Sequence, residues 1–145
     1  MKTMILYYSY GGTTKKLAEK MAEERNAELY EVKDKKRPPL IKAVFVGCAC
    51  SIRQIPTAIE PIVMDMEQYD RIIIMAPIWN GNAAPPIYNV ISMLPPGSLV
   101  EFYFVSKSGR SNQAAIITMI DEAHCTIVEY INLEAPKKEK KKKKT

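Results

Sequence analysis

The chain has 145 residues, of which 47% are hydrophobic and 26% are charged, a composition typical of a globular domain and not of a disordered or collagen-like chain. Its net charge is +5. Residues 137–144, with seven lysines and one glutamate, contribute +6, and residues 1–136 carry −1. The charge of residues 1–136 therefore does not indicate a nucleic-acid-binding domain. No apolar stretch approaches the roughly 20 residues that span a bilayer, and the amino terminus has no signal-peptide pattern. We therefore expect a cytoplasmic protein with no integral membrane segment.

The length predicts one domain over residues 1–136, followed by a disordered lysine-rich tail over residues 137–145. The three cysteines have neither CxxC spacing nor a companion Cys/His cluster, so we expect no disulfide framework and no metal site. Cys48 and Cys50 are interpreted as small buried side chains, and His124 as a residue that complements the end of a helix.

The first half of the chain begins with an apolar run, a glycine-rich turn and residues at helical spacing. These features predict a strand over Thr3–Tyr8, a turn over Ser9–Thr14, a helix that follows it, and a weaker strand over Ala27–Val32. A stripe of apolar residues predicts a further helix over Leu40–Arg53; the alternative is a strand, because Val44–Val46 has strand propensity and Gly47 weakens a helix.

The second half repeats the alternation of strand and helix. Consecutive apolar residues at Arg71–Ala76 predict a central strand, which ends in a loop at Pro77–Asn82 because Pro and Asn-Gly are turn signals. The remaining prediction is a helix from Ile87 to Leu94, a strand over Leu99–Val105, a small polar loop over Ser106–Ser111, a helix over Ala114–Ala123 and a strand over Thr126–Ile131.

This alternation predicts an α/β fold in three layers, an open doubly wound sheet of five parallel strands with helices on both faces. In such sheets ligands bind beyond the carboxyl ends of the strands, where the loops after the first, third and fourth strands converge. Those three loops have the unusual compositions in this chain.

The first of these loops combines three hydroxyl side chains with two glycines before a helix. Glycine lets the backbone approach an anion closely, and the helix amino terminus supplies N–H groups, so the loop suits a phosphate group. The alternative is a helix start capped by a hydroxyl group. The spacing GxxxxGK[ST] of a nucleoside-triphosphate loop is absent.

Tyr8-Ser9-Tyr10-Gly11-Gly12-Thr13-Thr14 resembles the phosphate motif of the flavodoxin family, T/S-x-T/S-G-N-T, at Ser9, Gly12 and Thr14. It departs from that motif at Gly11 and Thr13. The resemblance extends over nearly all of the chain before the tail, and it implies a flavodoxin-like fold with strand order 2-1-3-4-5 and flavin mononucleotide (FMN) as the cofactor. The loop Ser9, Tyr10, Gly11, Gly12, Thr13 and Thr14 is then expected to hold the FMN phosphate.

The second loop looks like the segment that meets the flavin in this family. It consists of Pro77, Ile78, Trp79, Asn80, Gly81 and Asn82. The only tryptophan of the chain lies here, and its indole face would stack on the flavin ring; the alternative is a packing role at the rim of the domain.

By the same resemblance, the third loop, with Ser106, Lys107, Ser108 and Gly109, covers the pyrimidine side of the flavin. It lacks the tyrosine that many flavodoxins place there, which implies one open face of the ring. Lys107 and Arg110 are equally compatible with solvated loop charges.

The resemblance implies an electron-transport flavoprotein, an oxidoreductase in the broad sense, whose partners are redox proteins. The alternative is an NAD(P)H-dependent FMN or quinone reductase of the same fold, for which the open flavin face leaves room; chain length favours the carrier. A flavin-free signalling module such as a phospho-receiver is less compatible, because no aspartate follows the predicted third strand. We expect a monomer or a homodimer.

Overall fold

The structure is a computed structural model that describes residues 1–36 and 56–136. Five parallel strands form its sheet in the order β2-β1-β3-β5-β6, and a short strand β4 pairs antiparallel with β3. The strands are β1 (Thr3–Tyr7), β2 (Glu28–Glu31), β3 (Arg71–Trp79), β4 (Asn82–Ala83), β5 (Leu99–Ser106) and β6 (Thr126–Glu134). Apart from the added β4, this order confirms the predicted flavodoxin-like arrangement.

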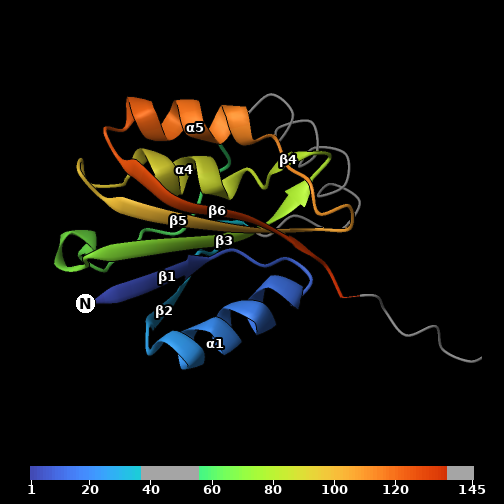
Figure 1. The fold of residues 1–145 in the computed structure, drawn as a ribbon, viewed down its shortest axis with the longest axis horizontal. Helices are drawn as coiled ribbons and strands as arrows, with labels where there is room; N and C mark the ends of the chain where they lie inside the picture. The colour runs from blue at the N-terminus through green and yellow to red at the C-terminus, as the bar shows by residue number, and fades with distance from the viewer. Residues whose placement is uncertain (37–55, 137–145) are drawn as a thin grey trace, which may run out of the picture.

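Helices lie on both faces of the sheet (Figure 1). Helix α1 (Thr13–Arg25) covers one face, and α4 (Pro86–Ser92) and α5 (Gln113–Glu122) cover the other, while a short 3-10 helix η2 (Met66–Gln68) precedes β3. The helix predicted over residues 40–53 and the tail predicted over residues 137–145 lie outside the described residues.

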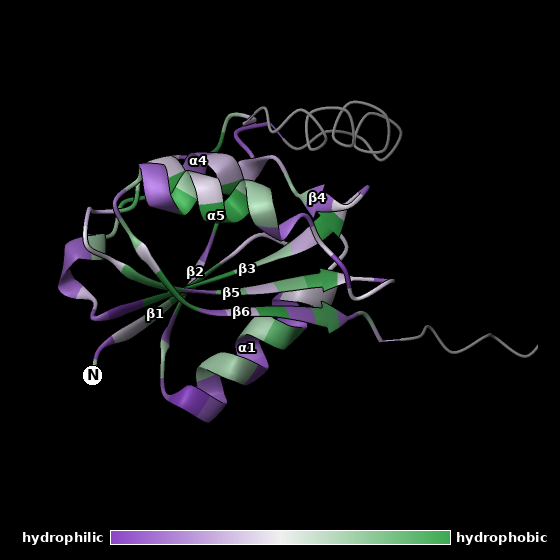
Figure 2. Ribbon diagram, turned by 45° about the horizontal axis from the view of Figure 1, so that its top comes forward, coloured by the Kyte–Doolittle hydropathy of each residue, from purple (hydrophilic) through white to green (hydrophobic). Residues whose placement is uncertain are grey.

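The centre of the sheet is apolar because both of its faces are covered. In β3, the residues from Ile72 to Ala76 are all buried, as expected for a central parallel strand. Phe102 and Phe104 of β5 pack on the α4–α5 side, and Ile5 and Ile73 pack against α1 on the other side. Figure 2 shows largely hydrophobic strands in the middle of the sheet, between helices in which hydrophilic and hydrophobic residues alternate.

The prediction that Pro77 and the next two residues form a loop is wrong, because β3 continues to Trp79. Asn80 (φ 51°) and Gly81 (φ 82°) both adopt left-handed conformations and make a two-residue turn, after which Asn82 pairs with Trp79. Positive φ at both central residues matches the twist of the flanking strands, which is why Asn-Gly favours a tight hairpin. Pro77 has no N–H to donate, and its carbonyl oxygen accepts a hydrogen bond from the Ala84 N–H at 3.1 Å.

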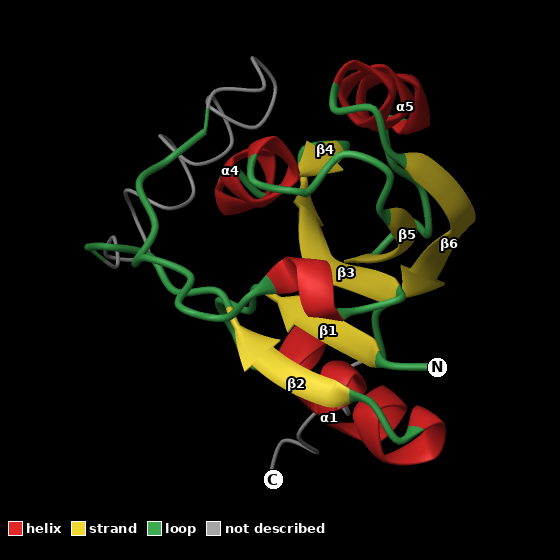
Figure 3. Ribbon diagram, turned by 90° about the vertical axis from the view of Figure 1, so that its left-hand side faces the viewer, coloured by secondary structure: helices red, strands yellow, loops and turns green. Residues whose placement is uncertain are grey.

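Strand β6 also runs further than the sequence predicts, to Glu134 instead of Ile131. Leu133 packs against the apolar cluster under α1, and the Asn132 side chain accepts a hydrogen bond from Ser111. Viewed from one end, the sheet twists strongly from β2 to β6 (Figure 3). The longer β6 brings residues after it to the carboxyl edge of the sheet.

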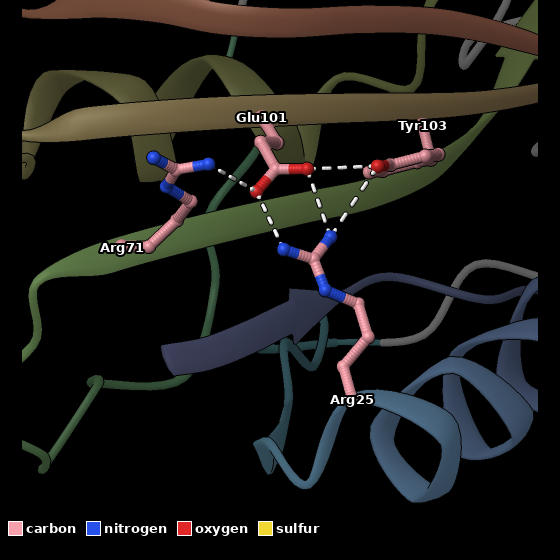
Figure 4. A network of polar contacts seen from close by, with 4 residues as sticks. All are labelled: Arg25, Arg71, Glu101 and Tyr103. Carbon is pink, nitrogen blue, oxygen red and sulfur yellow. Dashed lines mark hydrogen bonds and ion pairs between the residues drawn. The ribbon is translucent and has the colours of Figure 1, made fainter. Parts of the chain in front are cut away.

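A buried carboxylate joins three elements on the α1 side of the sheet (Figure 4). Glu101 of β5 is 3% exposed and accepts two hydrogen bonds from the guanidinium of Arg25 at the end of α1, at 2.8 and 2.9 Å. Arg71 of β3 donates a third bond at 3.2 Å, and the Tyr103 hydroxyl a fourth at 2.7 Å. These contacts, Arg25 first, lower the pKa of Glu101 to about 2, against the burial that would raise it.

Candidate functional site

A hollow of about 240 Å³ lies at the carboxyl edge of the sheet, where the loops after β1 and β5 meet the end of β3. Glu101 is five residues from the end of β5, or about 17 Å along the strand, so its ion cluster lies apart from this hollow. The residues that line the hollow are Ser9, Tyr10, Gly11, Thr13, Thr14, Pro77, Ile78, Trp79, Val105, Ser106, Lys107 and Ala135.

The loop after β1 forms the wall of the hollow at the start of α1. Gly12 is the residue before the helix and has φ 94°, a left-handed conformation that glycine adopts without strain. The Ser9 hydroxyl accepts a hydrogen bond from the Gly12 N–H at 3.1 Å, which closes the loop. No side chain caps the amino end of α1, and its first turn has no acidic residue. Its backbone N–H groups and helix dipole therefore suit an anion.

Trp79, which is half-buried, contacts two tyrosines edge-to-face, of which Tyr10 also lines the hollow. Its ring centroid is 6.1 Å from that of Tyr8 and 6.1 Å from that of Tyr10, with ring planes at 74° and 83° to its own. Tyr8 is buried, and its hydroxyl donates to the Asp34 carboxylate at 2.6 Å. Edge-to-face contacts of this kind are favourable, so the anchored Tyr8 helps to fix the indole orientation.

The hairpin that follows Trp79 is attached to the start of α5 through Asn112. The Asn112 N–H donates to the Gly81 carbonyl oxygen at 2.7 Å, and its side-chain amide donates to the Asn82 side chain at 3.0 Å. The same side chain accepts the Ala115 N–H at 3.3 Å and so caps α5. The loops after β3 and β5 are therefore held in a fixed relation to each other.

The loop after β5 folds back on itself. The Ser106 and Ser108 hydroxyls each accept a hydrogen bond from the Arg110 N–H, at 3.2 and 3.3 Å. Ser106 and Lys107 line the hollow, whereas Ser108, Gly109 and Arg110 do not. Lys107 is the one charged residue among the lining residues that the structure describes.

The structure thus brings together most of the side chains that the sequence singles out in three separate loops. Six predicted residues are outside the lining: Gly12, Asn80, Gly81, Asn82, Ser108 and Gly109. Two lining residues were not predicted, Val105 and Ala135. Val105 is the last residue of a predicted strand. Because ligands bind beyond the carboxyl ends of the strands in such sheets, its position could have indicated that it lines the hollow. Ala135 was missed because β6 was expected to end at Ile131.

Two other predicted features can be placed. His124 is exposed and adopts φ 58° after α5, where its N–H donates to the Asp121 carbonyl oxygen at 3.0 Å, so it terminates the helix at the amino edge of the sheet. Cys125 is half-buried, and Cys48 and Cys50 lie outside the described residues. Within residues 1–36 and 56–136, no group of three or more metal-ligating side chains is arranged to hold a metal ion.

No helix in the described part of the chain is both long and apolar enough to cross a membrane.

A family model described as NADPH-dependent FMN reductase matches residues 1–128. No curated protein matches the chain. Among solved structures, a flavoprotein in complex with FMN from Lactobacillus acidophilus NCFM is similar at 28% identity, with a TM-score of 0.71 over 89% of this chain and 91% of that one. Oxidised flavodoxin 1 from Bacillus cereus shares the fold at 18% identity, with a TM-score of 0.56 over 96% of this chain and 88% of that one. An NADPH-quinone reductase from P. pentosaceus does so at 9% identity, with a TM-score of 0.57 over 92% and 85%.

Proposed function

The chain belongs to the NADPH-dependent FMN reductase family, and on that premise we propose that it is an FMN-binding oxidoreductase that NADPH reduces directly. FMN is the cofactor, in agreement with the family model and with the FMN complex of the Lactobacillus flavoprotein. Bound FMN supplies the redox chemistry, taking up a hydride equivalent and passing electrons on.

The residues around the hollow fit this cofactor. The uncapped start of α1, with the hydroxyls of Ser9, Thr13 and Thr14, would hold the phosphate. Trp79 and Tyr10 offer apolar ring surfaces beside it for the flavin. The work of the protein is thus to bind and orient the cofactor and to shield part of it from water.

The observation that carries the choice of NADPH, beyond the family itself, is the composition of the loop after β5. Lys107, Ser108, Gly109 and Arg110 contribute no aromatic ring to the lining of the hollow. A flavin held against Trp79 would then keep its other face accessible to a second planar ring, as reduction by a nicotinamide requires.

The second candidate is an electron carrier reduced by a protein partner, which the sequence resemblance to flavodoxins favours. Three flavodoxins among the solved structures share the fold with this chain, at 15%, 16% and 18% identity. The cytoplasmic location and the monomeric or dimeric state stay predictions from the sequence.

Anaerobic stopped-flow mixing separates the two functions. We expect the FMN-loaded protein to lose the visible absorbance of its oxidised flavin promptly after addition of NADPH, because the nicotinamide reaches the flavin directly. A flavin that stays oxidised with NADPH and NADH, yet is reduced at once when a flavodoxin reductase is added, would assign the carrier function instead.

A further inference from the structure

Lys107 is the one charged residue among the described residues that line the hollow. Its side chain is exposed, and it makes no ion pair with a carboxylate of residues 1–36 or 56–136. Neither the phosphate, which the loop after β1 would hold, nor the stacking of the ring on Trp79 requires it. Its ammonium group is therefore free to face a ligand in the hollow.

The strand order places Lys107 on the side of the hollow away from the phosphate loop. Strand β3 lies between β1 and β5, and Pro77 of β3 pairs with Val105 of β5 (Figure 1). Two residues further along each chain segment, Lys107 comes beside Trp79. Neighbouring strands are about 4.8 Å apart, so the phosphate loop, which follows β1, starts about 10 Å from the backbone of Lys107. A flavin stacked on Trp79 with its phosphate at that loop presents its ring to Lys107.

Hydrogen bonds hold the backbone on both sides of Lys107. The Ser106 carbonyl oxygen accepts the Ala135 N–H at 2.7 Å, and the Ser106 hydroxyl accepts the Arg110 N–H at 3.2 Å. The first bond ties the loop after β5 to the end of β6, and the second closes the loop on itself. The backbone of Lys107 is thus fixed at the wall of the hollow, and only its side chain has to adjust to a ligand.

Negative charge lies on the opposite side of the hollow. The phosphate monoester of FMN carries about −1.5 to −2 at neutral pH and would stand at the start of α1. A second hollow of about 210 Å³, at the end of β2, has three carboxylates and one lysine in its described lining. The hollow proposed for the flavin has no acidic residue in its own described lining. Lys107 therefore determines the sign of the charge on the β5 side of the ring.

We propose that Lys107 stabilises the reduced, negatively charged form of FMN and so raises the reduction potential of the bound flavin. This inference rests on the proposed function, because it assigns a residue of the same site to the reduction step. A hydride, which is two electrons and one proton, passes from NADPH to FMN; a C–H bond of the nicotinamide breaks, an N–H bond of the flavin ring forms, and NADP⁺ is the product. The ring gains one negative charge until a further proton binds, and a nearby cation favours that charge.

The test is a potentiometric titration of the FMN-loaded parent and of Lys107→Gln in about 0.1 M salt, where the Debye length of about 10 Å screens distant charges. We expect Lys107→Gln to bind reduced FMN roughly three- to fivefold less tightly relative to oxidised FMN, as for the loss of one exposed charge. This ratio corresponds to a two-electron potential about 14–21 mV lower, because a tenfold ratio is about 30 mV. Lys107→Glu, which reverses the charge, should lower the potential about twice as far.

Arg110→Gln is the matched control, because Arg110 is an exposed cation of the same loop that lies outside the lining of the hollow. This variant should keep the parent potential, and so should Lys107→Arg, which keeps the charge at the wall. The dissociation constant of oxidised FMN is expected to stay near the parent value in Lys107→Gln, since the oxidised ring carries no charge for the ammonium group to stabilise.

Three results would overturn the inference. Equal potentials in the parent and Lys107→Gln would mean that the lysine does not act on the ring, and prompt reduction of both proteins by NADPH would leave the proposed function in place. Equal shifts in Lys107→Gln and Arg110→Gln would indicate an effect of net charge and not of a local contact. A loss of affinity that is the same for oxidised and reduced FMN, and absent for riboflavin, would assign Lys107 to the phosphate. Failure of the parent to bind FMN would instead contradict the proposed function itself.

Discussion

At the scale of single residues, the structure defines the position and ring contacts of Trp79, which the sequence alone does not predict. The sequence predicts that the tryptophan lies in a loop and meets the flavin, whereas the structure places it at the last position of β3. There the backbone pairing with Asn82 and the edge contacts with Tyr8 and Tyr10 restrict its orientation. An indole ring fixed before the cofactor arrives loses little conformational entropy on stacking, which favours binding.

Replacement of Trp79 tests its predicted contact with the flavin. Trp79→Ala removes the ring surface, and we expect the dissociation constant for FMN to rise about tenfold, since an aromatic stacking pair contributes about 0.5–1.5 kcal/mol beyond its buried area. Trp79→Phe keeps a smaller ring and should lose less. Because the chain has one tryptophan, titration of the flavin-free parent with FMN should quench most of the indole fluorescence. Saturable binding with an unquenched indole would exclude Trp79 from the site.

At the scale of elements, the two turns that were predicted as separate loops act as one unit. The β3–β4 hairpin and the start of α5 share Asn112, which bonds to Gly81, Asn82 and Ala115. The sequence indicates both turns through Asn-Gly and through the polar run before α5, but it contains no signal for the contact between them. This contact forms because β3 continues past Pro77 to Trp79. The sequence does not predict that continuation, because proline ordinarily ends a strand.

Asn112→Ser separates capping from positioning. Serine is a good N-cap residue but is too short to reach the Asn82 side chain, so α5 should keep its stability to within about 0.5 kcal/mol. The hairpin loses one hydrogen bond, a contribution of about 1 kcal/mol. We therefore expect lower fluorescence anisotropy of Trp79 in the flavin-free variant and a roughly threefold to fivefold weaker FMN affinity. Asn112→Ala, which removes the cap as well, should also lower the melting temperature. Unchanged anisotropy in the serine variant would restrict Asn112 to capping α5.

At the scale of the whole molecule, the sequence predicts the layers and the strand order, because alternating strand and helix patterns leave few topologies for a parallel sheet. It also predicts the edge of the sheet at which Ser9, Trp79 and Lys107 meet. It does not predict the ion cluster at the other edge. Glu101 lies in the run LVEFYFV, where an acidic residue suggests an exposed position, yet its partners Arg25 and Arg71 come from elements distant in the chain. Contacts of that kind depend on register and helix length, which local patterns leave open.

The same cluster gives the molecule a predictable response to acid. The pKa of Glu101 is about 2 in the folded protein and about 4.5 in the unfolded reference. A lowered carboxyl pKa stabilises the fold above pH 4.5, and this stabilisation is lost progressively as the pH falls from 4.5 toward 2. Glu101→Gln leaves two guanidinium groups without their carboxylate, so at pH 7 we expect a loss on the order of 3 kcal/mol in the free energy of unfolding.

Urea denaturation of the parent and of Glu101→Gln across this pH range checks the linkage. The difference in unfolding free energy between the two proteins should be largest at neutral pH and should shrink as the pH approaches 2, because protonated Glu101 resembles glutamine in charge. Glu122→Gln is the control, since Glu122 is an exposed carboxylate at the end of α5, on the other face of the sheet, and its removal should leave the difference from the parent unchanged across this pH range. Parallel pH profiles for the parent and Glu101→Gln would mean that the carboxylate charge does not stabilise the junction of α1, β3 and β5.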